Sequence, residues 1–215
     1  MIFHIITIFP LSFDSYINSS ILKRALEKNL IELKFYDLAN YSSVKSRRVD
    51  DKPFGWFPWA IISPIPLAKA ICDIQNNYGK LDIIYFSPKW KRLKQNFLER
   101  FAKSNNDTIL ICGHYEWIDQ RIIDIYNIIE ISIGEYILTS WELASIVFID
   151  WITRMLPWVI TDLSLIEESY SKKLGRKKEY PQYTRPREFM WKKVPWELLS
   201  GNPKIINKWK EDNIK

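Results

Sequence analysis

Residues 81–112, LDIIYFSPKWKRLKQNFLERFAKSNNDTILIC, contain the pattern that decides the fold. Short apolar runs at Leu81–Phe86 and Thr108–Cys112 predict two buried strands, and apolar residues at helical spacing over Leu93–Ala102 predict a helix between them. A strand, a helix and a further strand in this order form a unit whose two strands run parallel. The stretch therefore predicts an α/β fold built on a parallel sheet.

The same alternation continues on both sides of this unit. Further strands are predicted at Ile2–Ile8, Ile31–Tyr36 and Ile128–Ile131, and further helices at Phe13–Lys28, Ile65–Ile74, Ile118–Tyr126 and Glu142–Met155. The polar, basic segment Asn40–Pro53 is expected to be an exposed loop. Repeated strand and helix units indicate a sheet that is covered by helices on both faces.

The composition changes after residue 160. Thr161–Lys178 is rich in Ser, Glu, Lys, Arg and Gly, which is typical of a linker. Beyond it, Pro203–Asn213 predicts a basic amphipathic helix. We therefore expect a main domain at 1–160, a flexible linker at 161–178 and a small C-terminal domain at 179–215.

The bulk composition is that of a folded, soluble chain. With 31 Lys and Arg against 25 Asp and Glu, the net charge of +6 fits a polyanionic partner, although many proteins without one are equally basic. Cys72 and Cys112 lack CxxC spacing and only two histidines occur, so we expect reduced thiols in a cytoplasmic protein and no zinc site. The most apolar stretches are broken by prolines or charges, so no membrane span is expected.

Polar or glycine-containing loops follow three of the predicted strands. They are Ser87–Trp90, Gly113–Glu116 and Ser132–Leu138. Ligands of open α/β sheets bind outside the carboxyl ends of the strands, so these loops could form one pocket. Ordinary strand-to-helix turns are the alternative. The phosphate-binding GxxxxGK[ST] and dinucleotide-binding GxGxxG patterns are absent from the sequence.

Six motifs, spread in order along the chain, resemble one family. They are Ile5–Pro10 (IITIFP), Val49–Gly55 (VDDKPFG), Ile111–Glu116 (ICGHYE), Ser132–Leu138 (SIGEYIL), Tyr183–Pro186 (YTRP) and Leu198–Asn202 (LLSGN). On these residues the chain resembles the TrmD family of bacterial tRNA (guanine-N1)-methyltransferases, members of the knotted SPOUT superfamily. The resemblance implies S-adenosylmethionine-dependent methylation of N1 of the guanosine 3′ of the anticodon, position 37, after a preceding G.

The resemblance also implies the architecture. It implies a deep trefoil knot in a cofactor-binding catalytic domain at 1–160, a tRNA-binding C-terminal domain at 179–215 that is shortened relative to the family, and a homodimer with a shared active site. Magnesium dependence is implied as well. The implied cofactor-binding residues are Tyr85, Phe86, Ser87, Pro88, Gly113, Tyr115, Glu116, Ile133, Gly134, Glu135, Tyr136, Ile137 and Leu138.

The chemistry requires a base and a cation. Guanine N1 carries a proton at neutral pH, and its loss moves negative charge onto O6. By resemblance Arg154 is the cation and Glu168 the base, where the family has an aspartate. Alternatively, Arg154 caps the carbonyl groups at a helix end and Glu168 belongs to a solvated acidic linker.

Three residues of the 40–53 segment are candidates for tRNA recognition. By resemblance Asp50 reads the guanosine that precedes the target, and Arg47 and Arg48 contact phosphate groups. The alternative for all three is a solvated charged loop.

Tryptophan replaces glycine at several family positions. These positions are Trp56, Trp59, Trp90, Trp117, Trp141 and Trp158. The chain has only 6 glycines, whereas average usage would give roughly 15. Indoles at Trp90, Trp117 or Trp141 would compete with the cofactor for space. A protein that contains these tryptophans is therefore expected to bind S-adenosylmethionine poorly.

We hypothesise that the source organism reads UGA codons as glycine. The amino-acid sequence was instead translated with a genetic code in which UGA specifies tryptophan. UGG codons at these positions would contradict this. Trp209 matches a family tryptophan and is expected to be genuine. If the tryptophans are real, the alternative function is a catalytically inactive knotted RNA-binding protein. A methyltransferase acting on ribosomal RNA or on a ribose hydroxyl is the third candidate.

Overall fold

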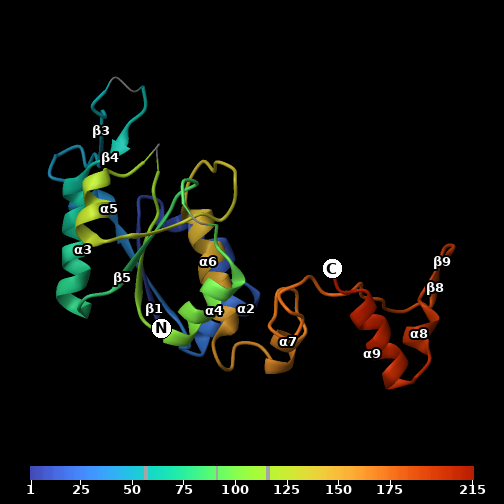
Figure 1. Cartoon of the computed structure of the whole chain (residues 1–215). Helices are drawn as coiled ribbons and strands as arrows, with labels where there is room; N and C mark the ends of the chain where they lie inside the picture. Colours follow the sequence, from blue (N-terminus) through green and yellow to red (C-terminus); the bar gives the residue numbers. More distant parts are fainter. Residues whose placement is uncertain (56–57, 91, 115–116) are drawn as a thin grey trace. The chain divides into compact units, whose positions relative to one another are not determined.

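The structure is a computed structural model that describes residues 1–55, 58–90, 92–114 and 117–215. The chain divides into two compact units, Met1–Ile160 and Thr161–Lys215 (Figure 1). Within the described residues, no helix is long and apolar enough to cross a membrane.

The first unit is built on a five-stranded parallel sheet with the strand order β2-β1-β6-β5-β7. The strands are β1 (Ile2–Thr7), β2 (Glu32–Asp37), β5 (Asp82–Phe86), β6 (Thr108–Ile111) and β7 (Ile129–Ile131). Side chains of β1 and β6 are buried on both faces, as expected for inner strands of a covered parallel sheet. The predicted α/β class is confirmed.

Helices cover both faces of this sheet. They are α1 (Asp14–Ile17), α2 (Ser20–Glu27), α3 (Pro64–Tyr78), α4 (Gln95–Ser104), α5 (Gln120–Tyr126) and α6 (Glu142–Met155), with short 3-10 turns η1 (Pro10–Phe13) and η2 (Leu38–Tyr41). Helices α3 and α5 lie on one face, and α2, α4 and α6 lie on the other (Figure 1). The single helix predicted over residues 13–28 is wrong, because Ser20 has a φ of 48°, which a continuous helix cannot contain.

The basic segment at residues 40–53 is not entirely a loop. Asp50–Asp51 forms the short strand β3, which pairs antiparallel with β4 (Ile61–Ile62). Within the loop, the Ser42 hydroxyl donates to the Arg48 carbonyl at 2.5 Å. These two-residue strands are too short to give an alternating sequence pattern, which is why they were not predicted.

The second unit carries most of the net positive charge of the chain. Residues 161–215 contain 13 of the 31 Lys and Arg but 8 of the 25 Asp and Glu, a net charge of +5. Its elements are α7 (Asp162–Ile166), β8 (Glu188–Phe189), β9 (Lys192–Lys193), α8 (Trp196–Leu199) and α9 (Pro203–Asp212). The segment 161–178, predicted as a linker, belongs to this unit, where the Lys178 amide donates to the Lys215 carbonyl at 2.7 Å. Its flexibility stays a prediction.

Glu167 joins three parts of the second unit. Its carboxylate accepts hydrogen bonds from Lys173, from the Tyr180 hydroxyl at 2.9 Å and from Lys210 at 3.1 Å. These bonds, with that from Lys173 the strongest, lower the pKa of Glu167 from 4.5 to about 2. The carboxylate is therefore ionised wherever the unit is folded near neutral pH.

We expect this carboxylate to make the second unit acid-sensitive. Because its pKa is lowered on folding, its contribution is complete above pH 4.5 and is lost as the pH falls toward 2. The contribution is about 1 kcal/mol, since a side chain that is 35% exposed is screened by solvent. Thermal melts of Glu167→Gln should show a lower Tm at pH 7 but not at pH 2. An equal decrease in Tm at pH 7 and at pH 2 would contradict the stabilising role of the ionised Glu167 carboxylate.

Candidate active site

The three loops that follow β5, β6 and β7 meet at one edge of the sheet. The Ser87 amide donates to the Ile131 carbonyl at 2.9 Å, and the Leu93 amide donates to the Ser132 carbonyl at 2.7 Å. The Trp141 amide, at the start of α6, donates to the Gly113 carbonyl at 3.2 Å. These hydrogen bonds hold the loops together at the carboxyl ends of the strands, where ligands of α/β sheets bind.

The predicted cofactor-binding residues are distributed over this edge. Tyr85, Phe86, Ser87 and Gly113 are buried, Pro88, Ile133, Gly134 and Leu138 are half-buried, and Glu135, Tyr136 and Ile137 are exposed. Tyr115 and Glu116 lie outside the described residues. The structure therefore brings the described members together from three separate parts of the sequence.

The loop after β7 is held by its own polar groups. The Ser132 hydroxyl donates to the Gly134 carbonyl at 2.9 Å, and Glu135 pairs with Arg92 at 2.5 Å. The Tyr136 ring covers the position where a Cβ atom on Gly134 would lie. A larger residue in place of Gly134 would displace this ring.

The space in front of Gly113 tests whether S-adenosylmethionine fits. A Cβ atom at Gly113 would lie 2.8 Å from Cδ1 of the Trp141 indole and 2.9 Å from the Tyr85 ring. The indole is itself buried, with 6% of its surface exposed. The loops match a cofactor site in their arrangement, but the side chains of this sequence leave no room for the cofactor at Gly113.

Trp90 and Trp117 lie at the border of the same region. They line a hollow of about 320 Å³ together with Lys89, Gln120 and Glu130. The Trp90 indole N–H donates to the Glu130 carboxylate, and the Lys89 ammonium lies 3.8 Å from the centre of the Trp117 ring. Burial raises the pKa of Glu130, and the hydrogen bond from Trp90 opposes this rise. Both indoles therefore border a cavity instead of filling it.

The two predicted catalytic side chains belong to different units. Arg154 lies in the last turn of α6 and is half-buried. Glu168 follows α7 in the second unit and is also half-buried. Their predicted catalytic roles stay predictions.

Two of the three predicted tRNA-contacting residues, Arg48 and Asp50, line one pocket. Arg48 pairs with Asp50 at 3.1 Å, and Arg47 donates to Asp37 at 3.1 Å. The pocket, of about 440 Å³, is lined by Arg48 and Asp50 together with the hydroxyls of Ser42, Ser43, Ser46 and Ser63. The serines were missed by the sequence reasoning, although three of them fall within five residues of one another.

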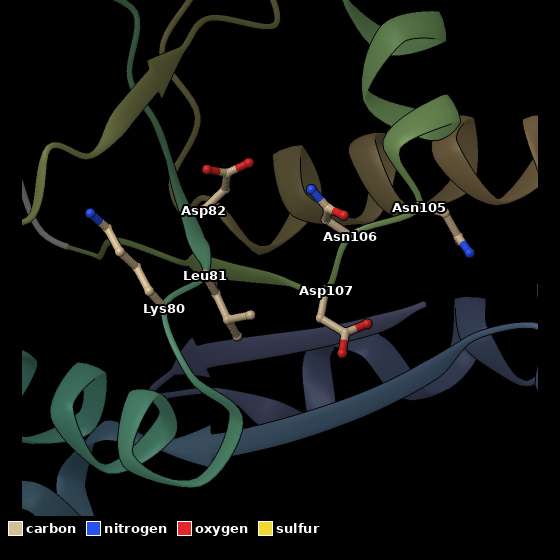
Figure 2. A pocket seen from close by; sticks show the side chains of 6 residues that line it. All are labelled: Lys80, Leu81, Asp82, Asn105, Asn106 and Asp107. Atoms are coloured by element: carbon tan, nitrogen blue, oxygen red, sulfur yellow. The ribbon is translucent and has the colours of Figure 1, made fainter.

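A second pocket, which is lined mainly by polar residues, lies at the end of the sheet opposite to the three converging loops. Figure 2 shows Lys80, Asp82, Asn106 and Asp107 around the amino ends of β5 and β6, where the hollow measures about 450 Å³. The Asp107 carboxylate accepts from the Ile2 amide at 2.6 Å, which gives it a structural role. The described residues contain no group of three or more His, Cys, Asp or Glu that could hold a metal ion.

Trp158 has a backbone conformation that favours glycine. Its φ is 70°, and 82% of its side chain is exposed, so no packing offsets the strain. This region costs an L-residue roughly 1–2 kcal/mol. The observation agrees with the hypothesis that position 158 is glycine in the natural protein.

We expect Trp158→Gly to raise the free energy of unfolding by about 0.5–1 kcal/mol, because the relieved strain exceeds the larger entropy loss of glycine. Denaturant titration measures this change. The matched control is Trp196→Gly, at an exposed tryptophan in α8, which should lower stability by about 0.5–1 kcal/mol. A lower free energy of unfolding for Trp158→Gly would contradict the inference that the backbone at Trp158 is strained.

Comparison with solved structures defines the class. The crystal structure of tRNA (m1G37) methyltransferase from Aquifex aeolicus matches with a TM-score of 0.79 and 34% identity, over 98% of this chain and 88% of that one. Together with the parallel sheet and its converging loops, this match identifies an α/β methyltransferase of the knotted SPOUT class.

Sequence comparison defines the family. The family described as tRNA (Guanine-1)-methyltransferase TrmD matches residues 1–215. A tRNA (guanine-N(1)-)-methyltransferase of Clostridioides difficile is 43% identical over 100% of this chain and 93% of its own length. The corresponding protein of Mycoplasma capricolum is 40% identical over 99% and 86%. The chain belongs to the TrmD family of tRNA (guanine-N1)-methyltransferases, and it is an enzyme of that kind.

Proposed function

We propose that the enzyme methylates N1 of the guanosine at position 37, immediately 3′ of the anticodon, when the preceding nucleotide is also guanosine. The observation that carries this proposal is the convergence of the loops after β5, β6 and β7 in a chain of this family. S-adenosylmethionine is the methyl donor that family membership implies. Its proposed pocket consists of the described residues among Tyr85–Pro88, Gly113 and Ile133–Leu138.

The proposed proton transfer uses one carboxylate and one guanidinium group. Glu168 accepts the proton from guanine N1, and Arg154 stabilises the negative charge that then develops on O6. The longer side chain of Glu168, compared with the aspartate of the family, changes where its carboxylate lies. A small misplacement of a reacting group is enough to slow this kind of step.

Recognition of the substrate is assigned to the basic loop and to the second unit. Asp50 is proposed to accept hydrogen bonds from the base that precedes the target, and Arg47 and Arg48 are proposed to bind phosphate groups. The charge of +5 on residues 161–215 supports tRNA binding by the second unit. Cytoplasmic localisation, where tRNA is modified, follows from this substrate.

A homodimer is part of the proposal. On α6, Leu143 and Val147 are one helical turn apart, and about half of each side chain is exposed (54% and 50%). This exposed apolar stripe supports the family's dimer, in which one protomer's first unit acts with its partner's second unit. The magnesium dependence of the family is also proposed, and chelation by EDTA is expected to lower turnover.

Two unmodified tRNA transcripts test the proposed substrate. One carries G36 and G37, and the other carries A36 and G37. Incubation with the enzyme purified from its source organism and S-adenosylmethionine, followed by nucleoside mass spectrometry, should give 1-methylguanosine at position 37 of the first transcript and much less in the second. Equal methylation of both would contradict recognition of the preceding guanosine, and a methylated ribose would contradict the proposed reaction.

A further inference from the structure

We propose that Trp141 alone closes the cofactor site of this chain and that glycine at this position opens it. Since Trp141 lies among the loops of the proposed cofactor pocket, this role rests on the proposed function. Three tryptophans lie near these loops, and their surroundings differ. Trp141 fills an interior space, whereas Trp90 and Trp117 border a hollow.

The Trp141 indole occupies the space that a ligand would need at the strand ends. Gly113 follows β6 and Tyr85 belongs to β5, the adjacent strand. The indole and the Tyr85 ring approach the same point above Gly113, to 2.8 Å and 2.9 Å from where a Cβ atom would lie. A ligand that binds against the Gly113 backbone would have to displace one of these two rings. Both rings are at least nine-tenths buried, so neither moves aside without repacking the core.

The backbone holds Trp141 in this place. Its amide donates to the Gly113 carbonyl at 3.2 Å, and its carbonyl accepts from the Ser145 amide at 2.9 Å. The residue has φ −94° and ψ −1°, a conformation with negative φ that L-residues adopt at the third position of type I turns. The backbone at Trp141 therefore tolerates a side chain, unlike that of Trp158. Replacement by glycine changes the space at Gly113 and leaves these two hydrogen bonds in place.

Trp90 and Trp117, unlike Trp141, do not occupy the space at Gly113. The Trp90 side chain is 56% exposed, and its indole N–H is satisfied by Glu130. The Trp117 ring contacts the Lys89 ammonium and borders the same hollow of about 320 Å³. Removal of either indole enlarges this hollow but does not vacate the space between Gly113 and Tyr85. These two residues therefore provide matched control variants.

Calorimetric titration with S-adenosylhomocysteine tests the role of Trp141. Five proteins are compared, namely the unchanged chain, Trp141→Gly, Trp90→Gly, Trp117→Gly and the triple variant that combines these three substitutions. Trp141→Gly should bind at least about tenfold more tightly than the unchanged chain, because a bulky ring no longer fills the site. Each control variant should stay within about twofold of the unchanged chain. Trp141→Ala serves as a second variant, with the ligand-induced shift in Tm as its readout, should the glycine variant fold poorly.

Three results would overturn the proposal. Micromolar binding by the unchanged chain would show that the indole does not close the site. A gain in Trp90→Gly or Trp117→Gly equal to that in Trp141→Gly would remove the special role of Trp141. Binding only by the triple variant would also remove the special role of Trp141, but it would leave the proposed function intact. If the triple variant also fails to bind, the cofactor site itself is misplaced and the proposed function fails with it.

Discussion

Arg154→Ala is expected to lower kcat by about 10²–10³-fold when measured in the Trp141→Gly background. This loss is typical for removal of one group that stabilises developing negative charge in a transition state. The KM for tRNA should change little, because the guanidinium is proposed to act on O6 only after the N1 proton leaves. Single-turnover methylation of a G36–G37 transcript measures the effect.

Two controls separate this role from a structural one. Arg121→Ala removes an exposed arginine of the first unit that pairs with Asp119 at 2.7 Å, and it should leave kcat unchanged. Arg154→Lys keeps the charge but loses the planar donor pair, so part of the rate should remain. If Arg154→Ala retained full kcat, Arg154 would have no role in the reaction and would only cap carbonyl groups at the end of α6.

Glu168→Gln is expected to lower kcat by about 10²–10⁴-fold in the same background, because the amide cannot accept the N1 proton. Glu168→Asp should retain activity or exceed the parent, since it restores the shorter side chain that the family uses. Single-turnover methylation of the G36–G37 transcript measures the rates of both variants.

The neighbouring carboxylate provides the control for Glu168. Glu167 is held by Lys173, Tyr180 and Lys210, and its substitution by glutamine should lower the stability of the second unit without a comparable loss of kcat. If Glu167→Gln and Glu168→Gln lost the same amount of kcat, the loss would reflect unfolding of this segment. Glu168 would then have no role as the base.

Strong periodicity explains which elements the sequence predicts well. Helix α6 was predicted with the bounds that the structure has, because its apolar residues repeat over fourteen positions. The strands β1 and β5 were predicted within one residue at each end, since buried parallel strands are continuous apolar runs. The paired strands β3 and β4 were missed because two residues carry no periodicity.

The candidate site was predictable only in part. The three loops could be expected to meet because parallel strands place their carboxyl ends at one edge. The cofactor-binding residues themselves came from the resemblance to the family. The contact of Trp141 with Gly113 joins residues 28 positions apart and depends on packing between α6 and β6, which no local pattern encodes. For the same reason, sequence could not rank Trp141 above Trp90 and Trp117 as the closing residue.

The most direct measurement uses the native protein, purified from its source organism with its methyltransferase activity intact. Trypsin releases the peptide Ile122–Arg154, which contains both Trp141 and Trp151, and fragment masses identify each residue. We predict glycine at position 141 and tryptophan at position 151, which would explain an active enzyme with an open cofactor site. Tryptophan at position 141 in an active native enzyme would contradict the closure by Trp141 and the proposed reading of UGA as glycine.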